Sequence, residues 1–152
     1  MAFPYRKILC PIDFDDNSLR ALDKAIEIAR HFGAAVLLVH ALPLVVQFGE
    51  VPIPFELYEE REKAARTKLG EIARQKLDGV DHELAVYTGD VVGCVLQAVA
   101  KFEPDLLVMA THGRSRLAHL FLGSVAEAVV RKASCPVLTI RSGALKEPAT
   151  KT

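Results

Sequence analysis

The chain has 152 residues, of which 51% are hydrophobic and 25% are charged, a balance that is ordinary for one globular domain with a sizeable core. Nineteen basic and nineteen acidic residues cancel, so no overall field favours binding to nucleic acid or to an anionic membrane. The longest uncharged apolar run, residues 34–46, is shorter than the roughly 20 residues that a membrane-spanning helix needs.

The amino-terminal segment contains no signal-peptide core and no cleavage site ahead of the first apolar run. We therefore expect a cytoplasmic protein that binds neither membranes nor nucleic acid. The three cysteines, Cys10, Cys94 and Cys135, lie far apart and form no Cys-x-x-Cys pair. Neither a zinc site nor a redox pair is predicted, Cys10 and Cys135 are expected to be buried, reduced and inert, and a redox-sensing role of Cys94 stays open.

Short apolar runs alternate along the chain with longer amphipathic segments, a pattern typical of strands that alternate with helices. The predicted strands are residues 7–12, 36–42, 82–87, 105–109 and 136–140. The first helix is expected to be capped within residues 15–17 and to end at Gly33, and the later helices are residues 56–77, 91–102 and 125–133. In the second helix the residues expected to face inward are Leu57, Ala64, Ala65, Leu69, Ile72 and Ala73.

This alternation predicts an α/β fold: one domain with an open parallel sheet of five strands and helices on both faces. The expected core covers about residues 5–141, and the polar residues 142–152 are expected to form a frayed tail. Residues 44–55, bordered and interrupted by prolines, are expected to form an irregular loop. The sequence alone does not give the order of the strands in the sheet.

The stretch from Ala110 to Ser124 joins the fourth predicted strand to the last helix and has the features of a phosphate-binding loop. Gly113 and Gly123 allow a ligand to approach the backbone closely. A helix N-terminus offers unpaired N–H donors and a partial positive charge, which suit a phosphate. An ordinary loop with a glycine turn and a Gly-Ser helix cap has the same local pattern, so the spacing alone leaves both interpretations open.

The spacing small-x2-Gly-x9-Gly-Ser in this loop resembles the ATP-binding loop of the universal stress protein family, Gly-x2-Gly-x9-Gly-Ser/Thr. Residues 7–13 (KILCPID) and 134–140 (SCPVLTI) are similar to the same family, and the likeness runs from about residue 5 to residue 141. Two positions depart from the family pattern. Ala110 stands in place of the first glycine, and Arg116 stands where a smaller residue is common.

The resemblance implies the strand order 3-2-1-4-5, in which ligands bind at the reversal of winding between strands one and four. It also implies ATP, accompanied by Mg²⁺, as a regulatory ligand, and a homodimer formed through strand five (residues 137–140). Pro11 and Ile12 would pack on the base, and backbone groups of Ala41 would face the base edge. The implied nucleotide-binding residues are Pro11, Ile12, Asp13, Ala41, Met109, Ala110, His112, Gly113, Arg114, Gly123, Ser124 and Val125.

Asp13 has two open roles: its carboxylate binds the adenine amino group, a ribose hydroxyl or a metal, or it caps the first helix. The sequence contains no P-loop lysine motif, dinucleotide fingerprint or nucleophile elbow, and no general base stands out, so no catalytic residue is predicted. Two alternatives therefore remain beside a regulatory ATP-binding protein. One is a dimeric interaction module that binds no nucleotide, and the other is a slow nucleotide hydrolase.

Overall fold

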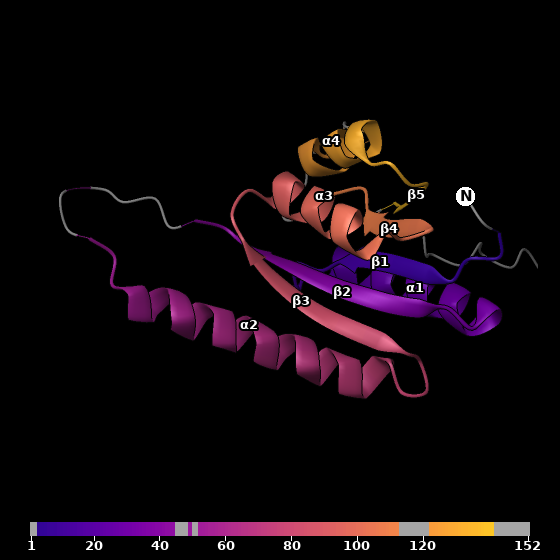
Figure 1. Cartoon of the computed structure of the whole chain (residues 1–152), viewed down its shortest axis with the longest axis horizontal. Helices are drawn as coiled ribbons and strands as arrows, with labels where there is room; N and C mark the ends of the chain where they lie inside the picture. Colours follow the sequence, from indigo (N-terminus) through magenta and orange to yellow (C-terminus); the bar gives the residue numbers. More distant parts are fainter. Residues whose placement is uncertain (1–2, 45–48, 50–51, 113–121, 142–152) are drawn as a thin grey trace, which may run out of the picture.

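The structure, a computed structural model, describes residues 3–44, 49, 52–112 and 122–141. Its five strands form one parallel sheet in the order β3-β2-β1-β4-β5, as the family resemblance implied (Figure 1). The strands are β1 (Lys7–Pro11), β2 (Ala35–Leu42), β3 (His82–Thr88), β4 (Leu106–Ala110) and β5 (Val137–Ile140). The helices are α1 (Asp16–Phe32), α2 (Phe55–Lys76), α3 (Val91–Phe102) and α4 (Ser124–Lys132).

Helices cover both faces of the sheet, and each face has its own hydrophobic core. Successive side chains of a strand point to opposite faces, so Ile8 and Cys10 of β1 pack with α1 and α2, whereas Leu9 packs with α3 and α4. The buried strands β1 and β4 read as continuous apolar runs for this reason. All predicted strands and helices are present, and their bounds differ from the predicted ones by one residue at most.

β1 and β4 are adjacent in the sheet but pair over a short distance only. Their register covers Ile8 with Leu106 and Leu9 with Leu107. Beyond these residues each strand stays with its other neighbour: β1 remains paired with β2 as far as Pro11, and β4 remains paired with β5 as far as Ala110. The carboxyl halves of the two central strands therefore separate, at the place where the winding of the chain reverses.

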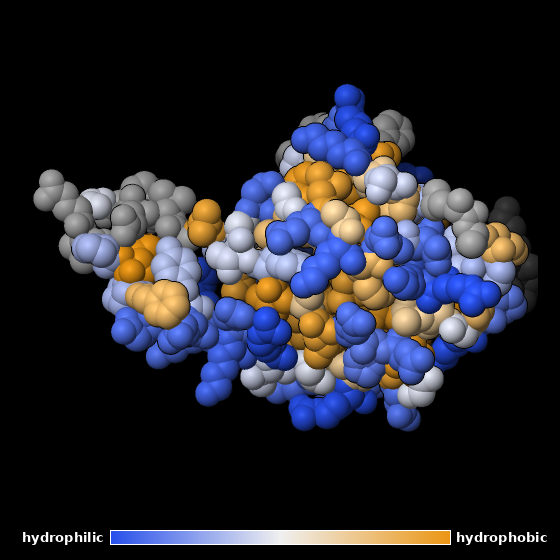
Figure 2. All heavy atoms as spheres, in the orientation of Figure 1, coloured by the Kyte–Doolittle hydropathy of each residue, from blue (hydrophilic) through white to orange (hydrophobic). Residues whose placement is uncertain are grey.

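The burial of α2 corrects the sequence prediction. Its amino-terminal half extends past the ends of the strands, and hydrophobic atoms lie exposed there (Figures 1 and 2). Leu57 is 41% exposed and Ala64 is also exposed, so neither residue is buried as the pattern predicted. The periodicity of a helix indicates which face is apolar, but it does not indicate where the sheet beneath the helix ends. The buried residues of α2 are Ala65, Leu69 and Ala73.

The cysteines are free and buried, and burial raises the pKa of all three thiols, which agrees with the expectation that Cys10 and Cys135 are unreactive. In the described part of the chain, none of the helices combines the length and the apolar character needed to cross a bilayer. The predicted tail (residues 142–152) and half of the predicted loop (residues 45–48, 50 and 51) lie outside the described residues.

Candidate functional site

A cavity of about 660 Å³ lies at the carboxyl ends of the strands, where β1 and β4 separate. Its volume falls in the range of small-molecule binding sites. Ten of the twelve predicted nucleotide-binding residues line it, and the other two, Gly113 and Arg114, lie outside the described residues. The ten residues are Pro11, Ile12, Asp13, Ala41, Met109, Ala110, His112, Gly123, Ser124 and Val125. The structure thus brings them together, and their contact with a nucleotide stays a prediction.

A network of hydrogen bonds among Asp13, Asp15 and Ser18 fixes the loop from β1 to α1. The Asp13 carboxylate accepts the N–H of Asp15 at 3.1 Å, and the Asp13 N–H donates to the Ser18 hydroxyl at 3.3 Å. Asp15 is the N-cap of α1 and accepts the N–H of Ser18 at 2.8 Å. Burial, together with the neighbouring Asp13 carboxyl, raises the pKa of Asp15. The alternative role of Asp13 as the cap of α1 therefore does not hold.

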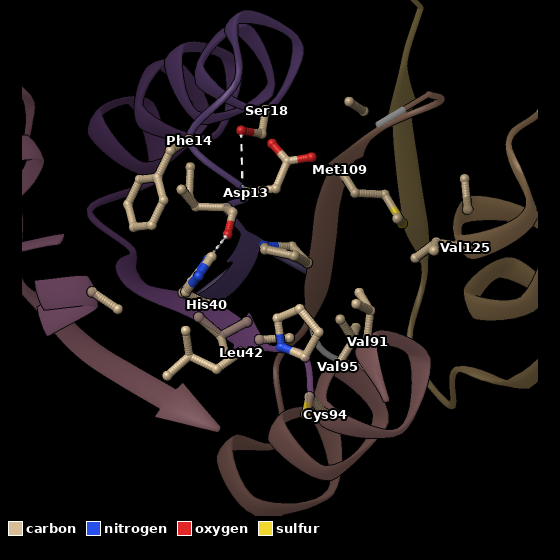
Figure 3. Close-up of a pocket in the computed structure, with 18 of the residues that line it drawn as sticks. Asp13, Phe14, Ser18, His40, Leu42, Val91, Cys94, Val95, Met109 and Val125 are labelled. Atoms are coloured by element: carbon tan, nitrogen blue, oxygen red, sulfur yellow. Dashed lines mark hydrogen bonds between the residues drawn. The ribbon is translucent and has the colours of Figure 1, made fainter. Parts of the chain in front are cut away.

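Phe14 and His40 form one wall of the cavity, a wall that the sequence analysis missed (Figure 3). Phe14 has a φ of 67°, a left-handed conformation that costs a non-glycine residue roughly 1–2 kcal/mol. The turn around Asp13 holds it there, and its ring lies 4.4 Å from the His40 ring, centroid to centroid. The His40 Nδ1 lies 2.6 Å from the Ile12 carbonyl oxygen, which requires a proton on Nδ1.

The opposite wall is apolar and comes from α3, β4 and α4. Its side chains line a cleft whose far side is formed by the end of β1 (Figure 3). Such a cleft suits a flat, mostly apolar ring system, because burial of the ring removes apolar area from water at no cost in unpaired polar groups. The labelled apolar residues of this wall are Val91, Val95, Met109 and Val125.

The amino end of α4 opens into the cavity without a side-chain cap. Its N-cap is Gly123, whereas the N-caps of α1 and α3 are aspartates whose carboxylates accept backbone N–H groups. The first hydrogen bond of the helix runs from the N–H of Glu127 to the carbonyl of Gly123 at 2.9 Å. The N–H groups of Ser124, Val125 and Ala126 therefore have no acceptor within α4, and all three residues line the cavity.

The structure gives a packing reason for glycine at position 123. The Gly123 φ of −67° is open to any residue, but a Cβ added there would lie 3.0 Å from the Thr111 carbonyl oxygen and 3.5 Å from the His112 Cα. The same carbonyl accepts the N–H of Gly123 at 2.6 Å. Glycine thus allows the two ends of the loop to approach each other.

Two further positions of the loop fit the expected site. Ala110 is the last residue of β4 and pairs with Ile140, so alanine fits the extended backbone there in place of the family's glycine. The His112 side chain lies at the cavity with Nδ1 3.2 Å from the Thr111 hydroxyl. Its Nε2 is buried and has no hydrogen-bond partner among the described residues.

The described residues contain no group of three or more His, Cys, Asp and Glu side chains arranged to hold a metal ion. Asp13 is the one carboxylate among the described residues that line the cavity. Hydrated Mg²⁺ is commonly bound by one or two carboxylates together with the phosphates of a ligand. Asp13 is thus the described carboxylate that would share a Mg²⁺ ion with the phosphates of a ligand.

The contact at Gly123 gives a stability prediction with a matched control. Gly123→Ala should destabilise the protein by about 1–3 kcal/mol, because the new methyl group presses on the Thr111 carbonyl. Gly70→Ala in α2 meets no atom within 4 Å and should stabilise by about 0.5–1 kcal/mol, because alanine has the higher helix propensity. Urea denaturation without nucleotide measures both. Equal stability of Gly123→Ala and the original protein would contradict the contact.

Comparison with known proteins gives the family. The universal stress protein family matches residues 4–141. A universal stress protein of Methanocaldococcus jannaschii is 34% identical over 142 residues, which cover 90% of this chain and 82% of that protein. Among solved structures, a universal stress protein family protein from Arabidopsis thaliana with AMP bound has a TM-score of 0.63 and 26% identity, covering 95% of this chain and 97% of that one. A universal stress protein in complex with cAMP has a TM-score of 0.62 and 25% identity, covering 90% and 97%. The chain belongs to the universal stress protein family.

Proposed function

We propose that this protein binds an adenine nucleotide, ATP accompanied by Mg²⁺, as a regulatory ligand in the cavity between β1 and β4. The observation that carries the proposal is the uncapped amino end of α4 beside an apolar cleft. One end of the site suits an anion and the other suits a ring, which together match a nucleotide. The relatives solved with AMP and cAMP support an adenine nucleotide as the ligand class.

The phosphates would lie at α4. The N–H groups of Ser124, Val125 and Ala126 and the Ser124 hydroxyl supply donors, and the helix adds a partial positive charge. The His112 side chain lines the cavity at the other end of the loop and would contact the phosphates there. Gly113 and Arg114, predicted from the family motif, complete the proposed phosphate site.

The adenine ring would lie in the apolar cleft. Pro11 and Ile12 form one side of it and Met109 the other, and Ala41 presents backbone groups at the end of β2. Asp13 lines the cavity, and its carboxylate would accept a hydrogen bond from the ribose or the base and bind Mg²⁺ together with the phosphates. The proposal includes the cytoplasmic location expected from the sequence.

The variant Ser124→Asp tests the phosphate site without weakening the fold. A carboxylate in the first turn of α4 should leave the helix as stable or stabilise it by about 0.3–1 kcal/mol, because it interacts favourably with the helix dipole. The same charge repels a phosphate, so the dissociation constant for ATP should rise at least about tenfold, or about 1.4 kcal/mol. Isothermal titration with ATP and Mg²⁺ at low ionic strength measures this change.

The control Ser124→Ala removes one neutral donor only. A hydrogen bond is worth about 0.5–1.5 kcal/mol net, so ATP affinity should fall about two- to tenfold and less than in Ser124→Asp. Unchanged ATP affinity in a folded Ser124→Asp protein would remove the amino end of α4 from the site.

We further propose that two copies of the chain pair through β5. β5 is an edge strand with β4 as its neighbour, and its Leu138 side chain is 37% exposed. An exposed apolar edge strand offers free backbone groups to another strand. A second copy of the same strand would cover this apolar edge.

Sedimentation velocity tests the dimer. The original protein should sediment as a dimer at micromolar concentration, and Leu138→Lys should shift it to a monomer, because a charge cannot be buried in the new interface without a partner. Leu57→Lys, at a similarly exposed leucine on the far end of α2, should leave the dimer intact. A monomeric original protein, or a dimer unaffected by Leu138→Lys, would exclude this interface.

A further inference from the structure

Two cations of α2 line the cavity at a place that the proposed nucleotide contacts do not use. Arg61 and Lys68 are seven residues apart, which is about two helical turns, so they lie on one face of α2. Ala64 and Ala65 lie between them and also line the cavity. The two long side chains thus lie on either side of a cavity surface that two alanines form.

Neither cation is neutralised within the described part of the chain. The Arg61 Nη1 donates to the Pro43 carbonyl at 3.3 Å, and the Lys68 Nζ lies 5.3 Å from the centroid of the Phe14 ring. No described carboxylate pairs with either of them, whereas Arg66 and Lys76 of the same helix pair with Glu62 and Asp23, at 3.0 and 2.6 Å.

Most of the donors of this pair are therefore available to a ligand. A guanidinium has five N–H donors and an ammonium has three. The described contacts are one hydrogen bond from Arg61 and the contact of the Lys68 ammonium with the Phe14 ring. The Phe14 ring holds the Lys68 side chain at the rim by a cation–π interaction. The acidic group that lines the same cavity is Asp13, in the loop from β1 to α1.

The α2 cations and the amino end of α4 lie on different sides of the sheet. α2 packs with α1 on one face, and α4 packs with α3 on the other (Figure 1). The cavity extends around the edge of the sheet from one helix to the other, because residues of both helices line it. It therefore has two separate positive regions. A nucleoside 5′-phosphate, with all its phosphates on one carbon of the ribose, matches only one of them.

We propose that this site, beside ATP, binds nucleotides with a second phosphoryl group on the ribose, which Arg61 and Lys68 contact while the 5′-phosphate lies at α4. This inference rests on the proposed nucleotide site. A 2′- or 3′-phosphate is separated from the 5′-phosphate by the sugar ring, so it matches a site with two anion-binding regions. Charge-assisted hydrogen bonds from a guanidinium and an ammonium are the usual means of binding such a group.

The test compares adenosine 5′-monophosphate with adenosine 3′,5′-bisphosphate and adenosine 2′,5′-bisphosphate by isothermal titration. At low ionic strength one of the bisphosphates should bind at least about tenfold more tightly than the monophosphate. This preference should decrease as salt is added, because the cations lie near solvent. Lys68→Met and Arg61→Met should each reduce the preference to about threefold or less and change the affinity for the monophosphate by less than about threefold.

The matched control is Lys63→Met, an exposed lysine of α2 that is not among the residues lining the cavity, and it should keep the full preference. Thermal denaturation establishes that the variants fold. Equal affinity for the monophosphate and both bisphosphates in the original protein would overturn the inference, as would a preference that survives both Lys68→Met and Arg61→Met. Failure of all three nucleotides and of ATP to bind would instead overturn the proposed nucleotide site.

Discussion

The separation of β1 from β4 is the constraint on which the site depends. The two strands pair through Leu9 and Leu107, and beyond this point each stays with its outer neighbour. The N–H of Ile12 donates to Val39 of β2 at 2.8 Å, and the N–H of Thr111 donates to Ile140 of β5 at 2.9 Å. These bonds draw the two loops apart. α1 and α4 then leave toward opposite faces of the sheet, and the crevice remains between them.

The same geometry decides the chemistry of the crevice. A cavity between separated strands is bordered by strand ends and by helices. The strand ends contribute apolar side chains from the core, whereas the helices contribute charged side chains and free backbone N–H groups. The apolar cleft comes from core residues that continue to the sheet edge, such as Met109, whereas the polar regions come from the amino end of α4, from His112 and from the α2 cations. A nucleotide, with its apolar ring and its charged phosphates, matches this distribution.

The strands and helices could be predicted from the sequence because their signals are local, whereas the order of the strands followed from the family resemblance. Apolar runs, caps such as Asp15 and the stop at Gly33 mark each element within one residue. The cavity residues on β1 and β4 followed from the family motif. Phe14, His40, Arg61 and Lys68 did not, because their place at the cavity depends on how α2 and the Asp13 turn pack in three dimensions. The spacing of two cations around two alanines in α2 was the available signal for Arg61 and Lys68.

The central claim is that a nucleotide occupies the crevice between β1 and β4. The most direct measurement is a crystal structure of the protein grown with saturating ATP and Mg²⁺. The account predicts the triphosphate within hydrogen-bond distance of the N–H groups of Ser124 and Val125, and the adenine ring between Pro11 and Met109. ATP bound elsewhere on the protein, or a crevice without nucleotide at that concentration, would contradict it.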